Sequence, residues 1–216
     1  MALPVFNPRF LVVSLGNPGV HYETLHSAGH VVLNAALKLL PADQPPWKAT
    51  RFGKEASLAS LGPKYILAQS PVLMNLSGRW VGRTWKGMLA KTDLAPDGLG
   101  FVLVHDDLEE ELGVVKIRDW TRSHRGHNGV KSVNLSLRHA DFPSSRWTRL
   151  SIGIGRPANR DTSSVSDYVL RPLSGHQMSV LRDQAAPAML EALAQLEARW
   201  EQDFLAAVKK DSHAGL

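Results

Sequence analysis

The feature that most constrains the fold is an apolar run near the start of the chain that ends in a polar turn. Residues Phe10–Leu15 are apolar except for one serine, which is typical of a buried strand. The next four residues, Gly16-Asn17-Pro18-Gly19, combine glycine and proline and favour a turn. Tyr22 and His26 follow soon after. Because ligands in open α/β sheets bind where parallel strands end, we expect a functional site at this turn.

Strands and helices are predicted to alternate along the rest of the chain. The predicted strands are 55–61, 64–69, 101–104, 114–118 and 150–154, and the predicted helices are 27–40, about 81–89, 131–137 and 175–210. We expect Pro187 to split or kink the last helix. This alternation favours a single α/β domain over residues 1–216, with its core at about 10–205. We expect a twisted, mixed and mostly parallel sheet, flanked by helices and followed by C-terminal helices.

The composition argues against several classes of protein. The 216 residues include no cysteine, which removes disulfides, a thiol nucleophile and cysteine zinc sites. No apolar run approaches the ~20 residues that a membrane-spanning helix needs. Because only nine residues precede the first predicted strand, we expect no signal or transit peptide.

The charge of the chain is basic and unevenly distributed. Lys and Arg number 25 against 20 Asp and Glu, which gives a net charge of +5. One basic region holds Arg118, Arg122, Arg125, Lys131, Arg138, Arg146 and Arg149, with two tryptophans among them. Such a cluster suits a polyanionic partner, although a solvated basic face is an equally good interpretation of the composition alone.

Amide, imidazole and carboxylate side chains gather where predicted elements end. They lie in the segments 17–26, 74–78, 105–107 and 124–129. Histidine can act as a general base near neutral pH, a carboxylate can fix its tautomer, and asparagine can bind a carbonyl without titrating. Each residue alone also has a simpler interpretation as a turn, cap or packed residue. Metal binding is a further alternative, but the His-Glu-x-x-His spacing of metalloproteases does not occur.

Five ordered motifs together resemble one known family. They are Gly16-Asn17-Pro18-Gly19 with Tyr22 and His26, Met74-Asn75-Leu76-Ser77-Gly78, His105-Asp106-Asp107-Leu108, Gly126-His127-Asn128-Gly129-Val130-Lys131 and Ile152-Gly153-Ile154-Gly155-Arg156-Pro157. In this order and spacing they resemble the bacterial-type peptidyl-tRNA hydrolases. The likeness covers roughly residues 10–205.

The resemblance implies hydrolysis of the ester bond between peptide and tRNA, which recycles tRNA from stalled or aborted translation. It implies that His26 is the catalytic base and that Asp106 orients it. The residues that it implies in binding peptide or tRNA are Asn17, Tyr22, Met74, Asn75, Arg118, His127 and Asn128. Arg118 matches a position that clamps tRNA phosphate. Ser151 stands at a second basic position of the family, and we expect Arg149, two residues earlier, to contact tRNA phosphate there. We expect peptidyl-tRNA as the partner, no metal, no cofactor and no membrane. We also expect a cytoplasmic monomer, or a mitochondrial one if the source is eukaryotic.

The chain also departs from the family pattern, and these departures leave alternatives open. Leu25 and Ser27 replace an arginine and an asparagine beside the histidine, and residues 119–125 replace a glycine-rich loop. The main alternative is an RNA-binding protein on the same fold, such as a plant organelle intron-splicing factor, that acts without hydrolysis. A hydrolase of small esters or amides is a third possibility, and it would need no basic surface.

Overall fold

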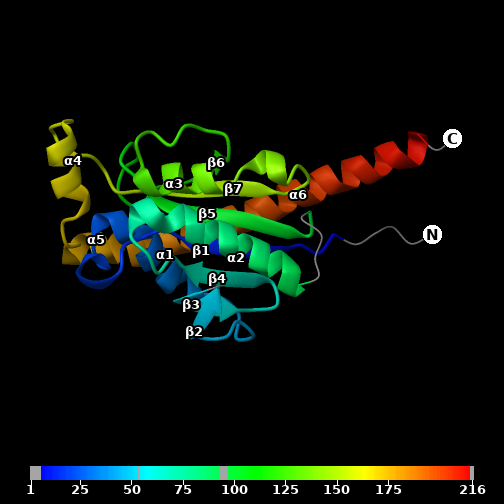
Figure 1. Cartoon of the computed structure of the whole chain (residues 1–216), viewed down its shortest axis with the longest axis horizontal. Coiled ribbons are helices and arrows are strands. Elements are labelled where there is room, and N and C mark those ends of the chain that lie inside the picture. The colour runs from blue at the N-terminus through cyan, green and yellow to red at the C-terminus, as the bar shows by residue number, and fades with distance from the viewer. Residues whose placement is uncertain (1–5, 53, 93–96, 215–216) are drawn as a thin grey trace.

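A computed structural model describes residues 6–52, 54–92 and 97–214, which form one sheet with helices on both faces (Figure 1). The strands are β1 (Arg9–Ser14), β2 (Lys48–Phe52), β3 (Glu55–Leu61), β4 (Tyr65–Gln69), β5 (Leu99–Asp107), β6 (Val115–Asp119) and β7 (Trp147–Gly153). The helices are α1 (Ala28–Leu37), α2 (Ser77–Thr92), α3 (Asn128–Ser136), α4 (Thr162–Val169), α5 (Gly175–Val180) and α6 (Ala186–Ala214). Short 3-10 turns η1 (Gly19–His21), η2 (Leu25–Ser27) and η3 (Met74–Leu76) precede α1 and α2. The predicted α/β class is confirmed.

The sheet is mixed, with strand order β2-β3-β4-β1-β5-β7-β6. Its four central strands, β4, β1, β5 and β7, run parallel to one another. The outer strands β2, β3 and β6 pair antiparallel, so parallel pairing is confined to the centre of the sheet rather than dominating all of it. Because β1, β5 and β7 point the same way, their carboxyl ends meet at one edge, where ligands bind in such sheets.

The sheet separates two apolar cores. Successive residues of β1 point to opposite faces, so Phe10 and Val12 enter one core while Leu11 and Val13 enter the other. The first core is completed by α1 and α6, and the second by α2 and α3. The long α6 extends past the sheet toward the C-terminus (Figure 1). No helix in the described part of the chain is both long and apolar enough to cross a bilayer.

Two local elements differ from the sequence prediction. Strand β2 was not predicted, because its exposed Lys48 and Arg51 break the apolar pattern of a strand. It lies at the edge of the sheet, where charged residues are common. Helix α4 was not predicted either. The expected division of the last helix near Pro187 is observed, because a π-helical turn at Leu181–Ala185 separates α5 from α6. A wider turn next to a proline accommodates its missing N–H and its clash with the preceding turn.

Candidate active site

A cleft of about 720 Å³ opens at the carboxyl ends of the central strands. Its floor includes residues from the end of β5, and its walls include η3, the 122–128 loop before α3, and α4. His26, from η2, faces this cleft together with the loop that follows β1. The structure therefore places a cavity at the edge where the sequence predicts a site.

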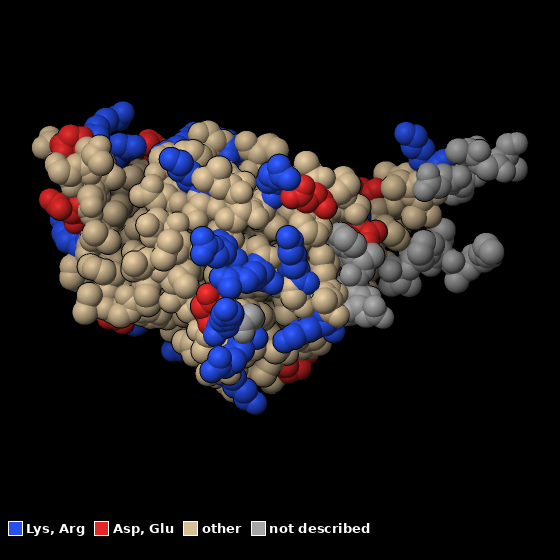
Figure 2. All heavy atoms as spheres, in the orientation of Figure 1, with Lys and Arg blue, Asp and Glu red and all other residues tan. Residues whose placement is uncertain are grey.

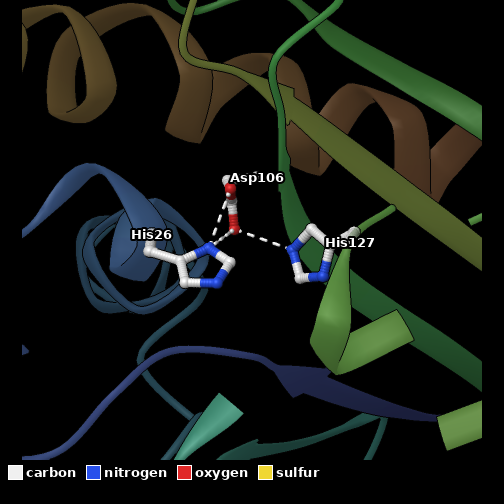
Figure 3. Close-up of side chains that lie close together, drawn as sticks. All are labelled: His26, Asp106 and His127. Carbon is white, nitrogen blue, oxygen red and sulfur yellow. Dashed lines mark hydrogen bonds and ion pairs between the residues drawn. The ribbon is translucent and has the colours of Figure 1, made fainter. Parts of the chain in front are cut away.

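Two histidines share one carboxylate in the cleft (Figure 3). The Nδ1 atom of His26 lies 2.9 and 3.0 Å from the two carboxylate oxygens of Asp106. The Nε2 atom of His127 lies 2.8 Å from Oδ1 of the same carboxylate. Asp106 is almost fully buried, with 3% of its surface exposed, whereas the His26 side chain is 13% exposed. Residues that are far apart in the sequence thus form one hydrogen-bonded group.

Helix α3 fixes which nitrogen of His127 carries the proton. The backbone N–H groups of Gly129 and Val130 both donate to Nδ1 of His127, at 3.1 and 3.2 Å. Nδ1 is therefore an acceptor, and the proton lies on Nε2, which donates to Asp106. His26 is arranged in the opposite way: its Nδ1 donates to Asp106, and its Nε2 has no hydrogen-bond partner among the described residues. His26 can therefore accept a proton from a molecule in the cleft.

The electrostatics of the pair suit a base that works near neutral pH. Burial lowers the pKa of His26, but the charge of Asp106 and its hydrogen bonds outweigh burial, so the net pKa is raised above 6.5. Burial raises the pKa of Asp106, but attraction to His26 and His127 and their hydrogen bonds hold it well below its usual range. Asp106 therefore stays ionised and can stabilise the imidazolium that forms when His26 takes a proton.

The same three side chains are close enough to suggest a metal site, but their hydrogen bonds argue against one. The ligand atoms of His26, Asp106 and His127 all lie within 4.8 Å of one another. A metal ion would need an unprotonated Nε2 on His127, and the proton would then have to move to Nδ1, where two N–H donors already point. His30, four residues after His26, is buried and bonds to Ser14, so it does not join them.

The predicted amides surround this group in different ways. The Oδ1 atom of Asn17 accepts a hydrogen bond of 2.8 Å from the backbone N–H of Met74, so its NH₂ group is left for a ligand. Asn75 and Asn128 also line the cleft, and neither side chain bonds to another described residue. Met74 lines the cleft but is largely buried. Three amides can therefore offer donors to a carbonyl or an oxyanion.

Close packing of α3 brings Asn128 to its place. A Cβ atom at Gly129 would lie 2.3 Å from Sδ of Met74, and one at Gly78 would lie 1.9 Å from the backbone oxygen of Ser132. At Gly78 only glycine fits without moving the backbone of α3, whereas at Gly129 a Cβ would require the Met74 side chain to shift. The two glycines of the motifs thus let η3, α2 and α3 approach one another at the cleft.

Arg118 and Arg149, which we predicted as phosphate contacts, already have partners in the protein. The guanidinium of Arg118 forms ion pairs with Asp107, at 3.2 Å, and with Glu110, and it donates to Ser151 at 3.0 Å. Arg149 is only 2% exposed and donates to the backbone oxygens of Asp119 and Arg122. Both line the cleft, and these contacts leave them little free capacity for a phosphate; the predicted phosphate contact itself stays untested.

Tyr22 is not among the described residues that line this cleft. Its hydroxyl donates to Oε1 of Gln69 at 2.8 Å, and its ring packs against His30 with centroids 5.5 Å apart. It lines a smaller cavity of about 270 Å³ beside α1. A contact between Tyr22 and substrate stays a prediction.

Several cleft residues were missed or undervalued by the sequence reasoning. His105 is fully buried beside His127, and burial lowers its pKa to about 3, so it stays neutral. Arg156 and Arg160 also line the cleft; Arg156 pairs with Glu109, and the Arg160 side chain has no partner among the described residues. No local pattern marks Arg160, because it lies just before α4 in a segment without a motif.

Comparison with known proteins agrees with this geometry. Residues 11–213 match the sequence profile of the peptidyl-tRNA hydrolases. The chain belongs to this family. A peptidyl-tRNA hydrolase of Delftia acidovorans is 34% identical over 189 residues, which covers 87% of this chain and 84% of that protein. One of Anaeromyxobacter dehalogenans is 41% identical over 165 residues, covering 74% and 76%. The crystal structure of peptidyl-tRNA hydrolase from Acinetobacter baumannii shares the fold, with a TM-score of 0.61, 22% identity and coverage of 91% and 98%.

The two departures from the usual peptidyl-tRNA hydrolase pattern beside His26 lie away from the cleft. Leu25 is fully buried in the apolar core with α1. Ser27 is also fully buried; its hydroxyl accepts a hydrogen bond from the backbone N–H of Asn17 and donates to the backbone oxygen of His21. These residues hold η2 and the loop after β1 together, so they help to position His26 and do not contact a ligand in the cleft.

Proposed function

We propose that this protein hydrolyses the ester bond between peptide and tRNA in peptidyl-tRNA, releasing free peptide and free tRNA, with His26 as the general base and Asp106 as its orienting group. The observation that carries the proposal is the unpartnered Nε2 of His26 beside a cleft, with Nδ1 held by an ionised carboxylate. The family of the chain supports the same substrate. Because peptidyl-tRNA arises at the ribosome, we place the activity in the cytoplasm.

The reaction needs only groups that line the cleft. Nε2 of His26 takes a proton from water as the water oxygen bonds to the ester carbonyl carbon. The carbonyl oxygen becomes an oxyanion, which the NH₂ group of Asn17, Asn75 or Asn128 can stabilise. The bond from carbon to the ribose oxygen then breaks, and the imidazolium of His26 returns the proton to that oxygen. An activated ester requires no covalent intermediate and no metal in this scheme.

The test is release of the acyl group from N-blocked aminoacyl-tRNA by the purified protein. We expect His26→Ala to lower the rate at saturating substrate by about 10²–10⁴-fold, because a positioned base contributes that much. Affinity for tRNA should stay within about twofold, since His26 binds no phosphate in this mechanism. Hydrolysis by His26→Ala at the wild-type rate would refute the proposed mechanism. An intact protein that binds tRNA without hydrolysing it would favour the alternative of an RNA-binding factor.

A further inference from the structure

A second group of positive side chains lies outside the cleft, on the face of the sheet that α2 covers. Figure 2 shows Lys and Arg side chains gathered over α2 and the β2–β3 hairpin. We call this group the α2 surface; its cations are Arg79, Arg83 and Lys86 on α2 and Arg51 and Lys54 at the β2–β3 hairpin. Within the described part of the chain, the one acidic partner in this group is Glu55, which pairs with Arg83 at 3.1 Å. The α2 surface is therefore strongly and locally basic.

Helix geometry places these charges in one row. Arg79, Arg83 and Lys86 are separated by four and three residues, so they lie on one face of α2. The other side of the helix buries Trp80 and Trp85 in the core. Like charges four residues apart on a helix repel each other and destabilise it, so this row of cations does not contribute to the stability of the fold. An anionic ligand would offset the repulsion.

The α2 surface begins at the cleft and leads away from it. Asn75 lines the cleft in η3, and Arg79 follows it by four residues at the start of α2. The distance along α2 from Ser77 to Lys86 is about 14 Å, from the rise of 1.5 Å per residue. The pair between Arg83 and Glu55 joins α2 to β3, which brings the hairpin cations Arg51 and Lys54 alongside. A chain of phosphates that leaves the cleft along α2 would meet several cations in succession.

We propose that the α2 surface binds the phosphate backbone of the same tRNA whose 3′ end enters the cleft. This inference rests on the proposed function, because it assigns a further contact to that substrate. Arg79, Lys86 and Lys54 are exposed, and none has an acidic partner among the described residues, so each can neutralise a phosphate and release its counterions. A compact acidic protein would not match a row of cations of this length as well as a phosphodiester chain does.

The test is a variant that neutralises three exposed cations and leaves the Arg83–Glu55 pair intact. This surface variant is Lys54→Gln/Arg79→Gln/Lys86→Gln. The control variant neutralises three exposed cations on the opposite face of the sheet and is Lys38→Gln/Arg182→Gln/Arg199→Gln. Both variants lose the same net charge. Two substrates are compared: full-length N-blocked aminoacyl-tRNA, and the same acyl ester on a fragment of only the last few 3′ nucleotides.

We expect the surface variant to lose about tenfold or more in kcat/KM on full-length tRNA at low salt, and to match the wild type on the short fragment. In direct titration with tRNA, the slope of log affinity against log salt should flatten by about two to three. Over a fourfold rise in salt, the surface variant would then lose about 16- to 64-fold less affinity than the wild type. The control variant should behave as the wild type in both measurements.

Equal kcat/KM and equal salt slopes for the surface variant and the wild type would overturn the inference. A loss of the same size in the control variant would also overturn it, because net charge rather than this surface would then be responsible. If the wild type hydrolyses neither ester, the proposed function fails, and the titration with tRNA still decides whether the α2 surface binds phosphate.

Discussion

Replacement of Asp106 by asparagine tests the central pair most directly. In the protein, Oδ1 of Asp106 accepts from both His127 and His26, while Oδ2 faces only Nδ1 of His26, at 3.0 Å. An asparagine that keeps its oxygen between the two histidines must place its NH₂ group against Nδ1 of His26. Two donors cannot face each other, so His26 shifts its proton to Nε2 and loses the lone pair that would accept a proton from water.

The size and sign of the effect follow from the same contacts. Loss of a correctly oriented base predicts a fall in kcat of about 10²–10⁴-fold. The charge and hydrogen bonds of Asp106 are also what raise the pKa of His26 above 6.5, whereas burial lowers it. With asparagine only burial remains, so the pKa of His26 should fall below its ordinary value. The acid limb of the pH–rate profile should therefore move to lower pH while the plateau drops.

The assay is the pH dependence of kcat/KM for N-blocked aminoacyl-tRNA, which reports the ionisation of the free enzyme. Asp107→Asn is the matched control, because it removes one carboxylate from the adjacent position, where the side chain pairs with Arg118 and not with His26. We expect the control to move the acid limb little. A rate for Asp106→Asn within a few-fold of the wild type, or an acid limb that stays in place, would refute the orienting role of Asp106.

Three further predictions concern metal, phosphate contacts and stability. Chelators should leave the rate unchanged, because Nε2 of His127 is used as a donor to the carboxylate; loss of activity that one metal restores would contradict this. In titrations with tRNA, Arg125→Ala should flatten the slope of log affinity against log salt by roughly one, because Arg125 is exposed at the cleft. Arg118→Ala should leave that slope unchanged. It should instead lower the thermal stability, because it leaves the carboxylates of Asp107 and Glu110 without their partner. Burial lowers the pKa of His30 from 6.5 to about 4. As the pH falls, His30 is therefore protonated in the unfolded state before it is protonated in the folded state. The free energy of unfolding should thus decrease by about 3 kcal/mol as pH falls from 6.5 to 4, and denaturant titrations of His30→Gln should show a shallower decrease.

Much of the fold could be predicted from the sequence because its signals are local. The apolar run of β1 and the glycine-containing turn after it are visible in adjacent residues. The pairing of His26 with Asp106 joins residues 80 positions apart, and it was predicted only because ordered motifs resembled a family. Strand ends explain why the two segments meet, since β1 and β5 are parallel neighbours whose carboxyl ends share an edge.

The arginines show what the sequence could not reveal. Arg118 appeared as one more cation of a basic region, but the antiparallel pairing of β6 with β7 places it beside Ser151 and turns it toward Asp107 and Glu110. Composition counts a charge and does not tell whether a carboxylate already neutralises it. Conversely, Arg79 and Lys86 attracted no attention in the sequence, because each stands next to a buried tryptophan, Trp80 or Trp85, and they join one exposed row only when the helix forms.

The difference between the two histidines at Asp106 comes from the backbone around them. Both rings bond to one carboxylate, but the first turn of α3 directs two N–H groups at the second nitrogen of His127, whereas the second nitrogen of His26 meets the cleft. The helix terminus favours an unprotonated acceptor, since its N–H groups carry partial positive charge. His127 is thereby anchored through Nδ1 and donates from Nε2 to Asp106. In the proposed mechanism only His26 exchanges a proton with substrate, so one carboxylate would serve a base on one side and an anchor on the other.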